Sequence, residues 1–293
     1  NNLAPAVDNF IRIEADVPGD TVATNTHART IGGQMVPLDN AVREVHMVAP
    51  NVLQVVLTDN IDNGVGNDGP TYQSGTWTVK RADGSNIGVT NKYRFSAPIG
   101  QPDYTTGYGG GVDDANINVD HKIFLVLNQN VGNREVLTIT GPGGVSFTLP
   151  FSDKYLETPV IQVNQVGYNP RATERWAYIS AWMGDGGGLS LSNFPSTADV
   201  IVQPTDYLAP RTVALDDTPI TLRSSFDPEV GAPVKQVDLS SLPAAEGVRY
   251  RVQIDGVGVS WATAVSEEAV YKAYYVAARG LFHNRWAGDL RLE

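Results

Sequence analysis

The stretch IQVNQVGYNP, residues 161–170, predicts a short β-strand that ends in a tight turn. Ile161 and Val163 are β-branched and alternate with a polar residue, which is the pattern of a strand with one buried face. Gly167, Asn169 and Pro170 favour a turn, because these residue types adopt the backbone angles that turns need. Short strands and turns continue on both sides of this stretch, so we predict a chain built mainly from β-sheet.

Before residue 161, five segments rich in β-branched and aromatic residues predict strands. They lie at 52–57, 75–80, 122–127, 135–139 and 145–149. Turn residues at 81–84 and 140–144 separate neighbouring strands, as hairpin connections do. The pattern predicts an N-terminal β-sandwich domain at residues 1–150, followed by a short linker at 151–158.

A second series of strands begins at residue 161 and continues at 177–180, 188–191, 200–202 and 248–254. This series predicts a second β-sandwich at residues 159–264. From Ser266 the pattern changes to that of a helix, with a serine suited to the N-cap and two acids, Glu267 and Glu268, in the first turn. Apolar residues cover more than half of the circumference of this helix, so we expect it to be covered on both sides.

The second half of the chain resembles the N-terminal region of glycoside hydrolase family 9, the cellulase-type enzymes. The resemblance rests on residues 161–170, on VDLSSL at 237–242, on GVRY at 247–250, and on Ser260 followed by Trp261. It extends to the segment FHNRWAG at 282–288, although Asn284 stands where the family usually has glutamine. The resemblance implies that the second sandwich is the immunoglobulin-like module of that family. It also implies that residues 265–293 hold the first helix of a catalytic α/α barrel whose remainder is missing.

The resemblance implies a parent enzyme that is an inverting, β-glucan-active glycoside hydrolase involved in polysaccharide degradation. Inversion needs two carboxyl groups, one to protonate the leaving oxygen and one to activate water. The family carries both groups in its barrel, so we expect this chain to be inactive and to support the barrel. Asp289, in WAGD at 286–289, matches part of the catalytic motif but comes too early, and we interpret it as a loop acid. The implied location is secreted or periplasmic.

Two alternatives remain open. The chain could be a stand-alone accessory protein that binds carbohydrate through its first sandwich. It could also self-associate through the C-terminal helix, because an uncovered apolar helical face favours association.

Composition excludes several classes of function. The 293 residues include 32 acids and 21 bases, a formal net charge of −11, which repels nucleic-acid phosphates and anionic lipid headgroups. No apolar run is long enough for a membrane helix, and the N-terminus lacks the pattern of a signal peptide. The absence of cysteine excludes disulfides and thiolate sites. Motifs for a hydrolase triad, a phosphate loop or a dinucleotide site are absent from the sequence, and the four histidines lack metal-ligand spacing.

Two loops rich in acids and glycine, at 59–69 and 109–120, are candidates for a structural calcium ion, because calcium prefers carboxylate and carbonyl oxygens. The candidate ligands are Asp59, Asp62, Asp68, Asp113 and Asp114. Neither loop has EF-hand spacing, and the alternative interpretation is a turn whose Asp and Asn side chains bond to their own backbone. We predict no other cofactor.

Carbohydrate binding, if present, needs exposed aromatic rings that stack on sugars. The candidates that we favour are Tyr104 and Tyr108, which lie in a loop, and Trp77. The strand alternation around Trp77 favours a core position over a binding role. Tyr72 and Trp182 are further aromatic candidates.

Overall fold

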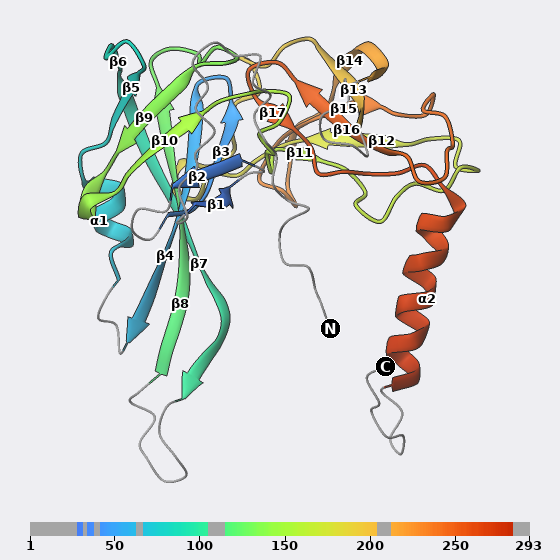
Figure 1. The fold of residues 1–293 in the computed structure, drawn as a ribbon, viewed down its shortest axis with the longest axis horizontal. Helices are drawn as coiled ribbons and strands as arrows, with labels where there is room; N and C mark the ends of the chain where they lie inside the picture. Colours follow the sequence, from blue (N-terminus) through green and yellow to red (C-terminus); the bar gives the residue numbers. More distant parts are fainter. Residues whose placement is uncertain are drawn as a thin grey trace.

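Two antiparallel sheets that share one core form the first part of the structure, a computed structural model that describes residues 28–31, 34–37, 42–62, 67–104, 115–203 and 212–283. The first sheet has the strand order β3 (Val42–Ala49), β4 (Val52–Asp62), β8 (Ala115–Leu127) and β7 (Val89–Tyr104). The second has the order β10 (Ser146–Pro150), β9 (Val136–Thr140), β5 (Thr78–Arg81) and β6 (Asn86–Ile87). Figure 1 also shows the hairpin β1 (Ala28–Ile31) and β2 (Gln34–Pro37) and the helix α1 (Gly69–Ser74), and a 3-10 turn, η2, spans Pro142–Gly144.

Alternating side chains from both sheets fill the space between them. Leu53, Val55 and Leu57 of β4 share one buried core with Leu137 and Ile139 of β9, and all five are fully buried. Residues two apart in a strand point to the same face, so this alternation places one face of each sheet in the core. The strands predicted from β-branched and aromatic content in this half are therefore confirmed.

The second part of the structure is a seven-stranded antiparallel sheet. Its order is β11 (Ile161–Gln162), β12 (Trp176–Ile179), β15 (Ala232–Asp238), β14 (Thr212–Asp227), β13 (Thr197–Gln203), β16 (Arg249–Ile254) and β17 (Gly258–Val259), with the 3-10 turn η3 at Gly184–Gly186. Residues of β14 up to Pro219 pair with β13, and those from Ile220 onward pair with β15. Because one long strand serves both halves, the strands form one nearly closed, barrel-like sheet, where the sequence had predicted a sandwich of two sheets.

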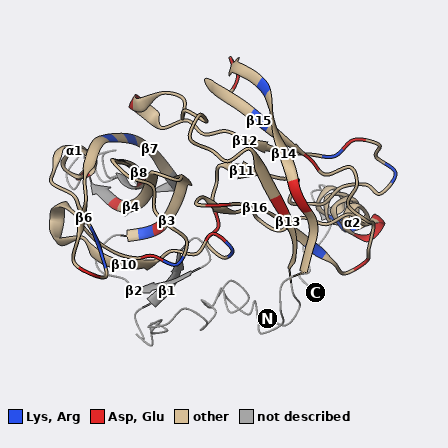
Figure 2. Cartoon of the chain, turned by 90° about the horizontal axis from the view of Figure 1, so that it is seen from above, with Lys and Arg blue, Asp and Glu red and all other residues tan. Residues whose placement is uncertain are grey.

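The two parts share a hydrophobic core at the point where they meet, which we call the joint. Val48, Val52 and Phe124, from the outer face of the first sheet, belong to the same buried cluster as Ile161 and Val200 of the second part. Seen from above, the two parts lie side by side (Figure 2). They are therefore packed together over an apolar surface.

The segment 151–158, predicted as a short linker, does connect the two parts, but it is mostly buried. Phe151 and Leu156 are at most 1% exposed and belong to the first core. Thr158 is also fully buried, and its backbone N–H donates to the carbonyl of Val259. The segment is therefore a packed stretch of chain, in contact with the first core and with β17.

The predicted C-terminal helix is confirmed as α2, which spans Glu267–His283 and extends away from the β-rich body (Figure 1). The hydroxyl of Ser266 accepts a 3.0 Å hydrogen bond from the backbone N–H of Ala269, as an N-cap does. Asn284, Trp286 and Asp289 lie outside the described residues. In the part of the chain that the structure describes, no helix is long and apolar enough to cross a membrane.

Candidate functional site

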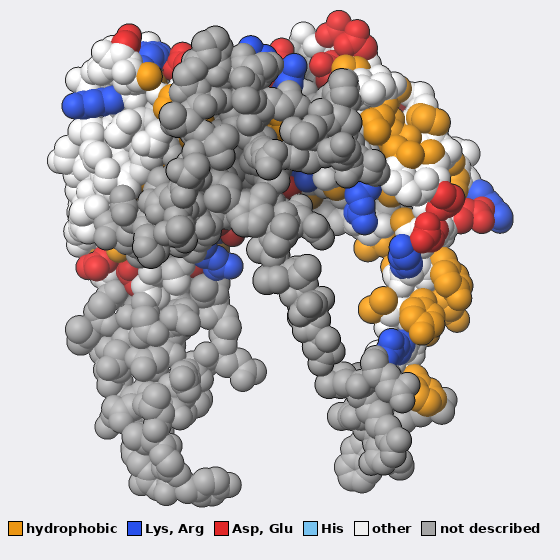
Figure 3. All heavy atoms as spheres, viewed as in Figure 1, with side chains coloured by type: hydrophobic (Ala, Val, Ile, Leu, Met, Phe, Trp, Pro, Cys, Tyr) orange, Lys and Arg blue, Asp and Glu red, His pale blue; other side chains and the backbone are white. Residues whose placement is uncertain are grey.

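The most exposed apolar surface of the described residues lies on α2. It consists of Val270, Tyr271, Tyr274, Tyr275, Val276, Leu281 and Phe282, which we call the α2 surface. Tyr274 is 70% exposed and Leu281 is 74% exposed. Figure 3 shows these hydrophobic side chains in orange along the helix. The sequence predicted that this helix would be covered on both sides, but the described residues do not supply that cover. Contiguous exposed apolar surface of this kind marks interaction sites.

The signature stretch 161–170 fixes the start of α2. The backbone N–H of Tyr168 donates to the carbonyl of Ala264 at 2.7 Å, and the N–H of Ser266 donates back to the carbonyl of Tyr168 at 3.2 Å. The Tyr168 hydroxyl donates to the carbonyl of Trp176, also in the second part, at 2.6 Å. The turn therefore links the sheet to the first turn of the helix.

The backbone conformation at position 167 of this turn requires glycine. Its φ is +120°, a conformation that side chains rarely adopt, and a β-carbon there would lie 2.9 Å from the β-carbon of Ala269. Arg171 forms an ion pair with Glu267 at 2.9 Å, which joins the turn to the helix, and Lys272 pairs with Glu268 at 2.8 Å within the helix. The contacts of Tyr168 and Arg171 hold the first turn of α2 against the second part.

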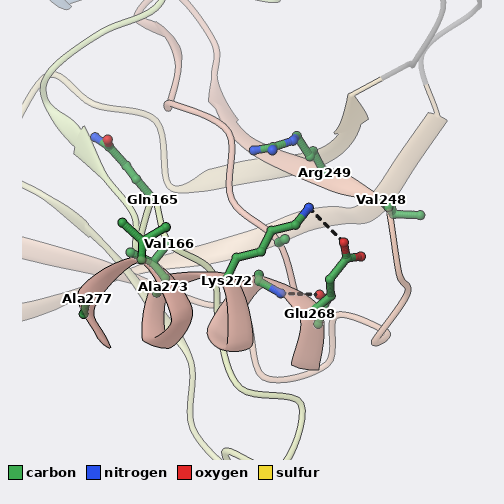
Figure 4. Close-up of a pocket in the computed structure, with 13 residues that line it drawn as sticks. Gln165, Val166, Val248, Arg249, Glu268, Lys272, Ala273 and Ala277 are labelled. Atoms are coloured by element: carbon green, nitrogen blue, oxygen red, sulfur yellow. Dashed lines mark hydrogen bonds and ion pairs between the residues drawn. The ribbon is translucent and has the colours of Figure 1, made fainter. Parts of the chain in front are cut away.

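A groove of about 500 Å³ runs between the inner side of α2 and the sheet. Val166 from the signature turn and Ala273 and Ala277 from the helix give it an apolar floor, as Figure 4 shows. Arg249 and Lys272 line its rim, and Lys272 is already paired with Glu268. The groove lies next to the α2 surface, so both belong to one region of the molecule.

The predicted calcium ligands divide between described and undescribed residues. The Asp59 carboxylate accepts a 2.7 Å bond from the backbone N–H of Asp68 and a 3.1 Å bond from the hydroxyl of Tyr72. The Asp68 backbone contact matches the alternative interpretation of a turn bonded to its own side chains. Asp62 lies at the end of β4 with its side chain outside the described part, and Asp113 and Asp114 lie outside the described residues. Within the described ranges, no group of three acidic or histidine side chains is arranged to hold a metal.

The candidate aromatic residues for sugar binding lie in different environments. Trp77 is 5% exposed within the first core, and its indole N–H donates to the carbonyl of Tyr72, so its ring is closed to a sugar. Tyr104 ends β7 with its side chain outside the described part, and Tyr108 lies outside the described residues. Trp182, by contrast, is 46% exposed at the joint and packs its edge against Phe95, with ring centroids 5.3 Å apart.

The structure also brings together a serine, a histidine and an aspartate that sequence motifs did not indicate. Ser96 of β7 stands directly opposite His121 of β8, and the Ser96 hydroxyl lies 2.7 Å from Nδ1 of that ring. On the other side of the ring, Nε2 lies 2.9 Å from Oδ2 of Asp59 of β4, a contact at ion-pair distance without hydrogen-bond alignment. We call these three residues the Ser96 cluster.

The residues of the Ser96 cluster are 25 or more positions apart in the chain, so only the register of three strands joins them. One signal was present in the sequence. Asp59 and His121 continue, at two-residue spacing, the apolar faces formed by Leu57 and Ile123. A polar residue in such a series indicates either a buried hydrogen-bonded group or a site.

Comparisons with known proteins give limited information. No family model matches the sequence, and no curated protein matches it. Solved structures with a distant likeness include pullulanase type I from Bacillus subtilis str. 168 complexed with maltose, at 9% identity and a TM-score of 0.21 over 74% of this chain and 23% of that one. They also include pullulanase from Bacillus acidopullulyticus, at 10% identity and a TM-score of 0.16 over 74% of this chain and 34% of that one.

The chain thus spans about a quarter to a third of the length of these pullulanases. With TM-scores this low, the likeness carries no argument about function. None of these findings is specific to family 9, and the resemblance to that family rests on the sequence motifs alone.

Proposed function

We propose that this chain is an accessory part of a carbohydrate-active enzyme of the family 9 glycoside hydrolase type, that it does not itself cleave glycosidic bonds, and that its α2 surface packs against the helical catalytic domain. The observation that carries this proposal is the α2 surface itself. A helix that is apolar around most of its circumference is normally buried, and Tyr274 and Leu281 are instead 70% and 74% exposed.

The contacts at the start of α2 favour a helical domain as the occupant of this surface. The capping serine, the Tyr168 contacts and the ion pair between the turn and the helix hold the first turn of α2, so the rest of α2 is presented in a defined direction. Tyr271 and Tyr275 stack one helical turn apart, with centroids 6.5 Å apart, and form a ridge of the kind that fits between the side chains of a neighbouring helix. The sequence motifs at 161–170 and 237–250 supply the further link to family 9.

The first test of this proposal is catalytic. We expect the 293-residue chain to release no reducing sugar from soluble β-glucan above a no-protein control, because the proposed catalytic carboxylates belong to the helical domain. The matching measurement is the intact mass of the product of the natural gene. We expect this product to be heavier than the 31.5 kDa of this chain and to cleave β-glucan. Turnover by the 31.5 kDa chain, or a natural product of that mass, would contradict the proposal.

Self-association is tested with the same protein. Light scattering after size-exclusion chromatography measures the mass of the chain in solution. A concentration-dependent dimer that dissociates on Tyr274→Ser would favour a second copy as the occupant of the α2 surface. A monomer is the result expected if the occupant is a different domain.

A second candidate function, carbohydrate binding, is favoured by the exposure of Trp182 at the joint. We expect Trp182→Ala to weaken the retention of the chain by an immobilised polysaccharide in affinity electrophoresis. Loss of a tryptophan ring that the bound partner covers costs about 2 kcal/mol, or roughly 30-fold in Kd. Tyr271→Ala, which removes an exposed aromatic ring from α2, is the matched control and should leave retention unchanged. Equal retention of Trp182→Ala and the parent chain would exclude Trp182 as a sugar platform.

A further inference from the structure

We propose that the Ser96 cluster is a nucleophilic site for acyl transfer, in which the Ser96 hydroxyl attacks short-chain carboxylic esters. Ser96 supplies the nucleophile, His121 the general base, and Asp59 the negative charge behind the base. This inference is independent of the proposed accessory function, because it concerns an ester bond and none of its residues belongs to α2.

The nucleophile and its base differ in exposure in the way that the reaction requires. Ser96 is exposed, whereas His121 is 1% exposed and Asp59 is 7% exposed. The serine therefore lies at the surface while the imidazole stays covered. With the ring proton on Nε2, the free Nδ1 accepts the Ser96 hydroxyl proton at 2.7 Å, and the Asp59 carboxylate lies 2.9 Å from Nε2 without being aligned with it. A nucleophile bonded to a base that a third group supports is the general arrangement of serine nucleophiles.

The surroundings of His121 keep it in the neutral form that a base needs. Burial is the main cause that lowers its pKa below the usual range, and the Arg94 charge acts in the same direction. The Asp59 and Asp120 carboxylates oppose this shift without reversing it. Tyr72 of α1 covers the ring, with centroids 6.1 Å apart, and its own pKa is raised by burial and by Asp59, so it remains a neutral donor to that carboxylate.

Arg94 places a positive charge where an oxyanion would form. Its Nη1 lies 3.4 Å from the Ser96 hydroxyl, and Nε donates to the side chain of Gln73 at 3.2 Å. The backbone N–H of Arg94 donates to Asp185 of η3 at 2.8 Å, so the second part of the structure helps to hold this strand. A fixed donor beside the nucleophile can stabilise the negative charge that develops on an attacked carbonyl oxygen.

The reaction balances with water as the only co-reactant. Ser96 Oγ bonds to the ester carbonyl carbon while its proton passes to Nδ1 of His121, and the carbonyl oxygen gains negative charge beside Arg94. The bond between that carbon and the alkoxy oxygen then breaks, and the alcohol leaves with the proton from His121. Water repeats the sequence on the acylated Ser96, which releases the carboxylic acid and restores the hydroxyl.

Gly69 offers a way to disturb this site without touching its functional groups. A β-carbon at Gly69 would lie 2.5 Å from both Nδ1 of His121 and Nη1 of Arg94, where a methyl group has no room. The backbone of Gly69 is not in the left-handed region, and the atoms nearest to an added β-carbon all belong to these two side chains. We therefore expect Gly69→Ala to fold and to displace the base from Ser96.

The experiment uses the full chain, a fluorophosphonate probe and 4-nitrophenyl acetate. We expect one probe adduct, located at Ser96 by peptide mass spectrometry, and ester hydrolysis that falls at least about 100-fold in Ser96→Ala, because this variant lacks the nucleophile. Gly69→Ala should lose most of the labelling rate while keeping the parent circular dichroism spectrum. Ser225→Ala, which removes an exposed serine from β14, should label like the parent chain.

The pH profile separates a base from a merely structural histidine. The labelling rate should stay high down to pH values below 6.5, because protonation of His121 is disfavoured, and should fall only at more acidic pH. His121→Gln should be slow at every pH. Labelling of the parent chain at the rate of Ser96→Ala, or an adduct on another residue, would overturn the proposal, and neither result bears on the β-glucan assay.

Discussion

Replacing Gly184 with alanine should separate the two parts of the structure and lower the free energy of unfolding by about 2–5 kcal/mol. This figure combines about 1–2 kcal/mol for a non-glycine residue in the left-handed region with about 1–3 kcal/mol for overpacking. Gly184 lies in η3 with φ of +68°, and a β-carbon there would overlap the backbone carbonyl of Arg94 on β7. A backbone carbonyl inside a sheet cannot rotate away as a side chain can. The turn would therefore have to move off the strand.

Gly231→Ala is the matched control for this prediction. Gly231 has φ of +70°, but the nearest atom to an added β-carbon is in Trp182 at 3.8 Å, an ordinary contact distance. It should cost only the backbone strain, about 1–2 kcal/mol. Urea unfolding gives both values. Trp182 packs on Phe95 across the joint, so the fluorescence that is lost in a Trp182→Phe background reports separation of the parts. Equal losses in the two variants would show that contact with β7 adds nothing to stability.

Local patterns predicted several strands and α2, because these patterns act over a few residues. They did not predict β3, β7 or β14, and the strand predicted at 188–191 is only an isolated bridge between Gly188 and Trp182. The alternation of Val79 with polar neighbours and the apolar run at 123–127 specify strands whose inner faces are buried. Ser266 and the acids after it specify where α2 begins, and the hydrogen bond to Ala269 matches that expectation. In both cases the determining interaction lies within one turn or one strand.

The joint and the Ser96 cluster could not be predicted in the same way, because they depend on contacts between distant residues. The buried character of Phe124 indicates a core position, but not that its neighbours come from the second part. Ser96 and His121 meet only because β7 and β8 pair in one register, and a shift of one residue would place His121 on the opposite face. The barrel-like seven-stranded sheet could not be predicted either, because it depends on where β14 changes partner, at Pro219 and Ile220.

Removing one member of the Arg251–Glu157 ion pair should destabilise the chain by about 3–5 kcal/mol, because the remaining charge stays buried without its partner. The two side chains are 10% and 17% exposed and lie 2.6 Å apart. Arg251 of β16 also donates to the carbonyl of Ser260 at 3.1 Å. The carbonyl of Glu157 lies 2.7 Å from Nδ1 of His46 on β3, so this pair lies where both parts and the segment 151–158 meet.

Three variants test this expectation in urea unfolding. Glu157→Ala should show the full loss. The double variant Glu157→Leu with Arg251→Met should recover most of it, because buried ion pairs replaced by apolar residues of similar volume are often neutral or stabilising. The exposed pair Arg171–Glu267, with side chains 80% and 61% exposed, is the comparison, and Glu267→Ala should cost less than about 1 kcal/mol. Equal losses in Glu157→Ala and Glu267→Ala would mean that water reaches the joint. The apolar contact between Phe124 and the second part would then not exclude water from this ion pair.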